Sequence, residues 1–169
     1  MEGLDQLKRL IVTLKNLPKE VLKSADTAMV NNSKELLDYN KEQLKSGMDS
    51  EAKPLRYKPK RVSKLSGNGA YTQAYDRFKG KRGGNTSYVD LNLSGDFFRG
   101  FMLDHESLGR FTIGSESKVF SGGSDLETEL KYNYGKDIFG LWEANLQKFA
   151  DENLKPEIEF EIEQLISRI

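Results

Sequence analysis

The sequence predicts an α+β fold, in which helices at both ends of the chain flank a small antiparallel sheet of three to four strands. Apolar residues recur every three or four positions before residue 47 and again after residue 140, which indicates amphipathic helices. Between residues 88 and 113 they alternate with polar residues over short runs, which is typical of half-buried strands. We therefore expect a single domain over residues 1–169, with the C-terminal helix packed on the sheet.

Two helices are expected before residue 47. Pro18 is expected to separate them, because proline lacks the backbone donor of a helix interior but suits a first turn. The second helix should run from about Lys19 to Ser46, where Gly47 ends it. The polar run 31–33 weakens its middle. The apolar stripe of the first helix consists of Leu4, Leu7, Ile11 and Leu14.

Residues 47–87 differ in composition from the helices predicted before them, and we call this segment the basic arm. They are rich in Gly, Ser, Lys and Arg and have no sustained apolar period, so an extended loop with one short helix over residues 71–78 is expected. Between residues 53 and 82, ten Lys and Arg residues face a single acid, Asp76, which gives a local net charge of +9. Because the whole chain has no net charge, the remainder carries −9. This separation of positive from negative charge along the chain gives information about binding partners and not about the fold.

The cations of the basic arm are therefore predicted to bind a partner. Tyrosines and Phe78 interleave with them, a composition that resembles nucleic-acid-binding segments. A loop of this charge suits an acidic protein surface equally well, including the body of a neighbouring copy. A solvated loop is the third interpretation. The predicted contact residues are Arg56, Lys58, Lys60, Arg61, Lys64, Arg77, Lys79, Lys81 and Arg82.

Short strands are expected in the middle of the chain. Alternating Val89, Leu91 and Leu93 predict a strand over residues 88–93. Ser94 should then cap a brief helical turn. Two strands around a turn follow, over residues 100–106 and 109–115, and a further short strand is expected at residues 119–120.

Helices return toward the end of the chain. Ser124, with Glu127 three residues later, has the capping-box pattern, which predicts the start of a helix there. Further helices are expected over residues 141–149 and 155–169, the latter with Pro156 in its first turn.

Aromatic residues crowd around two glycines between residues 132 and 149. We call this group the aromatic hinge and predict that it contacts partner proteins. Residues of this kind are as often part of a core, and the sequence does not separate the two interpretations. The hinge residues are Tyr132, Tyr134, Phe139 and Trp142.

No pattern of residues in the sequence indicates an active site, a cofactor-binding site or a metal site. The chain has no cysteine, which excludes disulfides and thiolate chemistry. Its one histidine, His105, is expected at the surface near a turn. The glycine-rich stretches 66–71 and 80–84 match no phosphate-binding loop. The acids between Glu157 and Glu163 are spaced by two and are expected on a solvated helix. We found no apolar run of membrane-spanning length and expect a protein made in a cytoplasm.

Several short motifs resemble one family. Leu91, Leu93, Ser94, Gly95 and Phe97 match a "Leu-x-x-(Thr/Ser)-Gly-x-(Leu/Phe)" element that follows a strand. The turn Ile113–Gly114–Ser115 and the pair Tyr132 and Tyr134 before Gly135 follow in the same order, and a helix closes the chain. Residues 88–169 thereby resemble the bacteriophage virion-morphogenesis or tail-completion family of head–tail joining proteins. Many relatives have a Pro-x-Arg-Pro-Phe turn after the glycine, where this chain has residues 136–146.

The resemblance implies a non-enzymatic structural subunit of the virion. Such a subunit would form an oligomeric ring at the head–tail interface or upper tail, as a neck, connector or tail-completion protein. Its partners would be other copies of itself and neighbouring neck, portal or tail proteins, close to the packaged DNA. It would be made in the bacterial host cytoplasm and located in the phage particle. The alternative function is nucleic-acid binding through residues 53–82.

Overall fold

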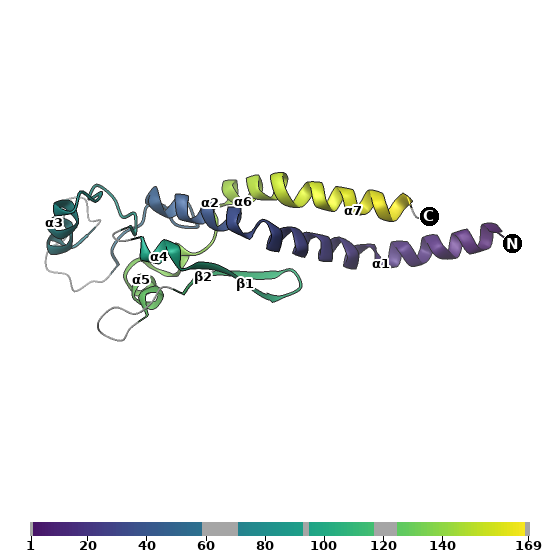
Figure 1. Cartoon of the computed structure of the whole chain (residues 1–169), viewed down its shortest axis with the longest axis horizontal. Coiled ribbons are helices and arrows are strands. Elements are labelled where there is room, and N and C mark those ends of the chain that lie inside the picture. Colours follow the sequence, from purple (N-terminus) through teal and green to yellow (C-terminus); the bar gives the residue numbers. More distant parts are fainter. Residues whose placement is uncertain (1, 59–70, 93–94, 117–124, 168–169) are drawn as a thin grey trace. The chain divides into compact units, whose positions relative to one another are not determined.

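The structure is a computed structural model that describes residues 2–58, 71–92, 95–116 and 125–167. The described part consists mainly of helices (Figure 1). These are α1 (Glu2–Asn31), α2 (Ser33–Lys45), α3 (Gln73–Lys81), α4 (Asp96–Arg99), α5 (Leu126–Tyr134), α6 (Glu143–Phe149) and α7 (Lys155–Ser167), with a 3-10 turn η1 (Lys136–Ile138) and a π-helical turn η2 (Ala150–Leu154). The strands are β1 (Phe101–Ser107) and β2 (Arg110–Ser115).

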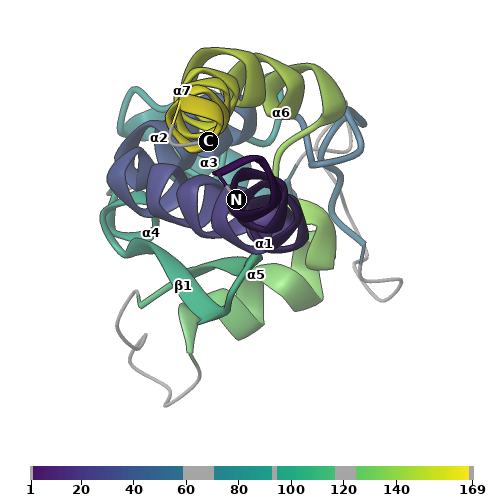
Figure 2. The ribbon, with the colours of Figure 1, turned by 90° about the vertical axis from the view of Figure 1, so that its right-hand side faces the viewer.

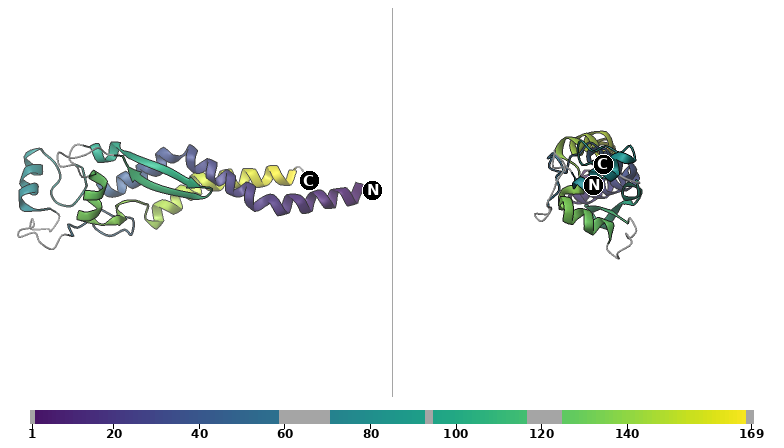
Figure 3. Two further views of the ribbon diagram at one scale, coloured as in Figure 1. Left: turned by 90° about the horizontal axis from the view of Figure 1, so that it is seen from below. Right: turned by 90° about the vertical axis from the view of Figure 1, so that its left-hand side faces the viewer.

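The predicted sheet of three to four strands is wrong. Within the described residues there is one two-stranded antiparallel sheet, the β1–β2 hairpin (Figure 3). The hairpin itself was predicted at these positions. The expected strand at residues 119–120 lies outside the described residues.

Residues 88–92 form an irregular segment, with a side-chain-bonded turn at residues 90–92, instead of the predicted strand. The Asp90 carboxylate accepts the backbone N–H of Asn92 at 3.0 Å, and Leu91 has a positive φ of 51°. An aspartate that bonds the backbone two residues on offers the chain an alternative to strand pairing. The alternation of Val89 and Leu91 therefore does not correspond to a sheet here. Leu93 and Ser94 lie outside the described residues.

The predicted helix break at Pro18 is also wrong, because α1 continues through this residue. The interruption falls at Asn32, in the polar run that was expected to weaken the helix. Both the backbone N–H and the side-chain amide of Asn32 donate to the Ala28 carbonyl, at 3.0 and 2.9 Å. Asparagine competes for backbone groups in this way, which disfavours a continuous helix. A new helix, α2, begins at Ser33.

Two helices begin at side-chain caps that were not predicted, Thr72 and Asp125. The predicted cap Ser94 lies outside the described residues, and α4 begins after Gly95 without a side-chain cap. The Thr72 hydroxyl accepts the Tyr75 N–H at 3.2 Å and begins α3, close to the short helix expected there. Helix α5 begins after Asp125, whose carboxylate accepts the Glu127 N–H at 3.2 Å. The predicted cap Ser124 lies outside the described residues. Asp125 therefore supplies the acceptor that a helix start needs.

The chain divides into two compact units, and the single-domain organisation remains a prediction. The first unit contains residues 1–34, 105–111 and 147–169. In it α1 and α7 lie side by side and run in opposite directions, so that both chain ends lie at the same end of the helix pair (Figures 1 and 2). The C-terminal helix thus packs on α1, which corrects the predicted packing on the sheet.

The first unit buries few side chains. Among its residues 12, 15–34, 105–111 and 147–167, only Ala28 and Phe149 are buried. The apolar face that α7 turns inward is half-buried at Ile158, Ile162 and Leu165. Large apolar side chains are exposed on both helices, at Val12, Leu22, Val30, Phe160 and Ile166.

The second unit contains residues 35–104 and 112–146 and has a true apolar core. Phe97 is its centre: the ring lies 4.9 Å from Phe101 and 5.9 Å from Phe139, measured between ring centroids. Edge-on and tilted contacts of this kind add to the stability gained from burial alone. The buried core residues are Leu37, Leu44, Leu55, Tyr71, Val89, Phe97, Phe98, Phe101 and Ile138.

Candidate functional site

The structure separates the predicted cations of the basic arm into three groups. Arg56 and Lys58, which precede the undescribed stretch 59–70, are exposed. On and just after α3, Arg77, Lys81 and Arg82 are exposed as well, and the Arg82 guanidinium lies 4.1 Å from the centre of the Phe78 ring. Lys79 is buried. The remaining three residues, Lys60, Arg61 and Lys64, lie outside the described residues.

Lys79 is part of an interior polar cluster and is not available to a partner, which corrects its place in the predicted contact set. Its side chain is 1% exposed and forms an ion pair with the Asp90 carboxylate. Its ammonium also donates to the Tyr71 hydroxyl at 2.7 Å, and this hydroxyl donates to Asp90 at 3.1 Å. Buried charges are tolerated only when they are paired and hydrogen-bonded in this way. The cluster holds α3 against the turn at residues 89–92.

The fold of the neighbouring loop explains how Lys79 is enclosed. A Cβ atom added at Gly84 would approach the Lys79 side chain to 2.7 Å, and the Gly84 N–H donates to the Lys79 carbonyl at 3.1 Å. A glycine is required there because the backbone itself covers the lysine stem. Burial raises the pKa of the Tyr71 hydroxyl, which stays protonated and continues to donate to Asp90.

The residues of the aromatic hinge have three different environments. Phe139 and Tyr134 are partly buried and pack against the core of the second unit. Trp142 is half-buried, and its indole N–H is buried without a hydrogen-bond acceptor among the described residues. Tyr132 is 75% exposed. Core and surface interpretations therefore each apply to part of the hinge, and only Tyr132 is largely open to a partner.

Two buried amide side chains of α2 hold the hinge in place. Asn40 and Gln43 both donate to the Gly140 carbonyl, at 2.8 and 3.2 Å, and Gln43 accepts the Trp142 N–H at 2.9 Å. Gly140 has a φ of +110°, a conformation that residues with a side chain rarely adopt. This geometry accounts for the glycine that separates Phe139 from Trp142.

The basic arm and the aromatic hinge, which are far apart in the sequence, meet in the second unit. The Lys58 N–H donates to the Asn133 carbonyl at 2.7 Å. The ring of Tyr57 lies 5.9 Å from that of Tyr134, edge to face. At this junction lies a pocket of about 290 Å³, which we call the tyrosine pocket.

Aromatic and aliphatic side chains form most of the tyrosine pocket, with a few polar groups. Its rings are Tyr57, Tyr71, Tyr75, Tyr134 and Phe97, its aliphatic residues are Leu91, Leu126 and Leu130, and its remaining residues are Thr72, Gly95, Glu129 and Asn133. Burial raises the pKa of the Tyr75 and Tyr134 hydroxyls, since both are shielded from water. A volume of this size, at the lower end for ligand pockets, holds one large side chain or a small molecule.

The charged residue in the wall of the pocket is an acid, Glu129. Arg56 and Lys58 precede and follow the wall residue Tyr57 in the sequence, and both are exposed. The Lys58 side chain lies against Gly135, next to the wall residue Tyr134. The site therefore combines an apolar, aromatic interior with an acid in its wall and a lysine beside it.

No local pattern in the sequence predicts this pocket. Tyr71 and Tyr75 are four residues apart, which places them on one side of a helix start, but nothing in the sequence links them to Tyr57 or Tyr134. The link depends on the long-range bond between residues 58 and 133. Such pairings have no local sequence pattern.

The structure also places the residues considered for chemistry. His105 lies on β1, half-exposed, with its Nε2 atom 3.0 Å from the Asp26 carboxylate and its ring stacked on Phe111. Glu157, Glu159 and Glu163 are exposed on α7. In the described ranges, no three His, Asp or Glu side chains gather closely enough to hold a metal ion. None of the helices in these ranges is long and apolar enough to cross a membrane.

Comparison of the chain with protein families, with curated proteins and with solved structures gave no match.

Proposed function

We propose that this chain is a non-enzymatic structural subunit of a bacteriophage virion, which assembles with copies of itself into a ring at the head–tail interface or upper tail. The observation that carries the proposal is the small core of the first unit. An amphipathic helix must bury its apolar face against another element, and two helices alone leave much of that face open. In the first unit, Ala28 and Phe149 are the only buried residues among residues 12, 15–34, 105–111 and 147–167, and α7 has none among residues 155–167.

Further subunits would supply the missing cover. Val12 is 58% exposed and Phe160 is also 58% exposed, and exposed apolar side chains on a helix pair are a feature of surfaces that bind other proteins. Head-to-tail contacts that close generate rings, and they need two unlike surfaces on each subunit. The exposed cations of the basic arm and the exposed acids of α7 are two such surfaces.

The assignment to a phage virion depends on the resemblance of residues 88–169 to tail-completion proteins. Part of the implied element order is present in the chain: the β1–β2 hairpin is followed by α5, by Gly135 and by the closing helix α7. The turn at residues 90–92 departs from the implied strand.

Light scattering coupled to size-exclusion chromatography tests the proposal. The full chain should form oligomers, either alone at increasing concentration or when it is mixed with the portal, neck and tail proteins encoded beside it. Mass spectrometry of purified particles of the same phage should detect the chain. A protein that stays monomeric in every mixture and is missing from the particles would contradict the proposal.

Nucleic-acid binding is a second candidate function, favoured by one observation. Arg77, Lys81 and Arg82 are exposed on and just after the short helix α3, and Arg82 stacks on Phe78. Cations and aromatic rings in this arrangement suit the phosphates and bases of a single strand. A gel shift at about 150 mM salt, lost when Lys58, Lys60 and Arg61 are changed to Glu, would support this function. Loss of DNA binding without any change in oligomeric state would favour it over assembly.

A further inference from the structure

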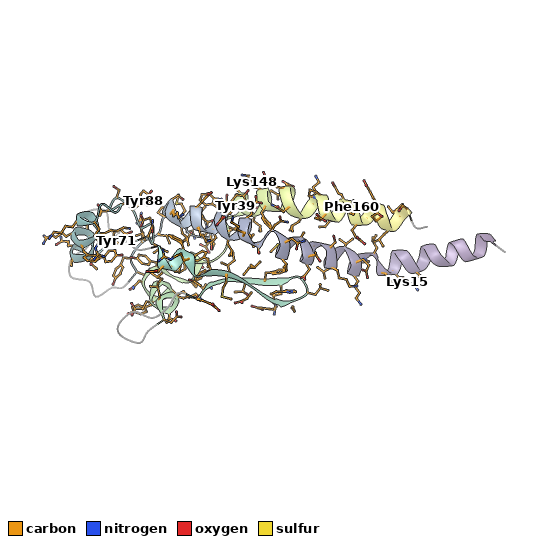
Figure 4. The ribbon with its side chains drawn as sticks, viewed as in Figure 1. Lys15, Tyr39, Tyr71, Tyr88, Lys148 and Phe160 are labelled. Atoms are coloured by element: carbon orange, nitrogen blue, oxygen red, sulfur yellow. The ribbon has the colours of Figure 1, made fainter. Side chains whose placement is uncertain are left out.

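The tyrosine pocket brings together five aromatic rings that are far apart in the sequence. Tyr75 lies on α3, Phe97 on α4 and Tyr134 on α5, while Tyr57 and Tyr71 lie outside the helices. Tyr71, which Figure 4 labels, precedes α3 and is 2% exposed. Every described residue that lines the pocket belongs to the second unit, so the site lies within one compact part of the chain.

Three of these rings are open to the pocket. Tyr57, Tyr75 and Tyr134 are half-buried, whereas Tyr71 and Phe97 are buried in the core. The planes of the Tyr57 and Tyr134 rings meet at 77° with their centroids 5.9 Å apart, so these two rings form adjoining sides of the pocket. Burial raises the pKa of the Tyr75 and Tyr134 hydroxyls, because this region is shielded from water.

Aromatic rings in such a position attract cations. The face of a ring carries partial negative charge, and a cation within about 6 Å of the ring centre is held most strongly where water is excluded. The second unit already contains such a contact, since the Lys79 ammonium lies 4.7 Å from the centre of the Tyr71 ring. Within the described residues no cationic group lies over the rings of Tyr57, Tyr75 or Tyr134. These three rings therefore have surface available to a ligand.

Helix α5 supplies the remaining features of a cation site. Its lining residues recur three or four positions apart, so that one face of the helix forms a wall of the pocket. Glu129 lines the pocket and is exposed, which places this acid at the opening, where negative charge attracts cations. Leu126 and Leu130 add apolar surface for a hydrocarbon stem. The Lys58 side chain lies against Gly135 and is not among the lining residues.

We propose that the tyrosine pocket binds an organic cation of the alkylammonium class, with its charged head among the rings of Tyr57, Tyr75 and Tyr134. Glu129 attracts the ion at the opening, and the leucines of α5 contact its stem. The volume of about 290 Å³ accommodates a small free ion or a lysine side chain of a partner protein, which share this chemistry. The inference goes beyond the proposed function, because the pocket needs no second copy of the chain.

Matched small molecules test the role of the charge. Choline, its neutral isostere 3,3-dimethylbutan-1-ol and the carboxylate 3,3-dimethylbutanoate have similar shapes and different charges. Calorimetry and ligand-observed NMR spectroscopy with the full chain measure their binding. Choline should bind at least about fivefold more tightly than the isostere, because the rings favour the cation by about 1 kcal/mol or more. The carboxylate should bind least, and ring currents should shift the N-methyl resonance of bound choline upfield.

Lysine derivatives identify the source of the cation. N-acetyl-lysine methylamide, with and without three methyl groups on its side-chain nitrogen, represents a lysine of a partner protein. Tighter binding of either derivative than of choline would assign the pocket to a protein side chain. Tighter binding of choline would assign it to a free ion.

Variants of the full chain locate the site. Tyr75→Leu keeps an apolar side chain but removes a ring, and should weaken choline binding about five- to thirtyfold. Tyr75→Phe retains the ring and should bind choline as the unmodified chain does. Glu129→Gln should weaken binding about two- to fivefold, and additional salt should reduce this difference.

Matched controls keep the effects specific. Tyr132→Leu removes a ring that is 75% exposed and does not line the pocket. Glu159→Gln removes an exposed acid of α7, in the first unit. Both proteins should bind choline as the unmodified chain does. Circular dichroism and urea unfolding establish that each variant is folded.

Three outcomes would overturn the inference. If the isostere binds as tightly as choline, the pocket recognises apolar shape and not charge. If 3,3-dimethylbutanoate binds more tightly than choline, Lys58 and not Glu129 sets the preference. If choline and both lysine derivatives fail to bind the folded chain, or bind the Tyr75→Leu protein equally well, the pocket is not a cation site. Each of these outcomes leaves the proposed function standing, because that function is tested by the oligomeric state.

Discussion

The ammonium group of Lys79 is bonded to the carboxylate of Asp90 in the interior of the second unit, where the lysine side chain is 1% exposed. The Tyr71 hydroxyl contacts both groups. One residue from the most basic part of the sequence thus stabilises the fold. The remaining described cations of the basic arm stay at the surface.

Loss of the Lys79 ammonium is expected to destabilise the second unit. Lys79→Ala leaves the Asp90 carboxylate, whose side chain is 11% exposed, without its cation, and breaking a buried ion pair from one side costs about 3–5 kcal/mol of unfolding free energy. Urea unfolding measures the change. Lys81→Ala, at an exposed position on the same helix, should change the unfolding free energy by less than about 0.5 kcal/mol. If both substitutions change the unfolding free energy equally, the ion pair between Lys79 and Asp90 contributes nothing to stability.

Alanine substitutions at two glycines are expected to change the stability of the protein in opposite directions. Gly140 has a φ of +110° and presents its carbonyl to Asn40 and Gln43, so Gly140→Ala should destabilise the protein by about 1–3 kcal/mol. Gly80 lies inside α3 with a normal helical backbone, and an added Cβ would meet the Thr86 methyl at 3.7 Å, an ordinary contact. Gly80→Ala should therefore stabilise the protein by about 0.5–1 kcal/mol. Thermal unfolding of both variants measures these changes. Unfolding temperatures that shift in the same direction for both variants would contradict the prediction.

Local patterns in the sequence predicted part of this structure. The apolar periodicity of the terminal helices, the β1–β2 hairpin and the short helix expected near residues 71–78 all depend on residues within a few positions of one another. Local patterns mislead where a side chain bonds the backbone and overrides them. Asp90 bonds the backbone of Asn92 and turns the chain where alternation predicted a strand.

The candidate site was less predictable than the fold. The basic arm and the aromatic hinge were identified separately, but their contact depends on the bond between Lys58 and Asn133, 75 residues apart in the printed sequence. The predicted set also included Lys79, since composition does not distinguish a buried lysine from an exposed one. Burial is decided by tertiary partners such as Asp90.

The tip of the β-hairpin is expected to depend on Asp26 of α1. This carboxylate accepts the Gly109 N–H at 2.7 Å and lies 3.0 Å from the His105 Nε2 atom, all within the first unit. Asp26→Ala should reduce the protection of the Gly109 amide against hydrogen exchange and destabilise the first unit by about 1–3 kcal/mol. Asp104→Ala, at an exposed position on β1, is the control and should leave this amide protected. Unchanged protection in the Asp26 variant would show that the carboxylate does not hold the turn.

Alkaline pH is expected to destabilise the protein through its buried tyrosines. Burial raises the pKa of Tyr71, Tyr75 and Tyr134 in the folded chain. The unfolded chain releases these protons near pH 10, whereas the folded chain retains them, so above about pH 10 the unfolded state binds fewer protons. The free energy of unfolding must then fall as pH rises. This stabilisation is fully present below the unfolded pKa and is lost as pH rises toward the folded values.

Urea unfolding at about pH 9 and about pH 11 measures this dependence, on either side of the ordinary tyrosine pKa. Tyr75→Phe removes one of the buried hydroxyls, and its unfolding free energy should fall less between the two pH values than that of the unmodified chain. Tyr132→Phe is the matched control, because Tyr132 is 75% exposed. If Tyr75→Phe and the unmodified chain lose stability equally over this interval, the Tyr75 hydroxyl is open to water and the walls of the pocket are not dry.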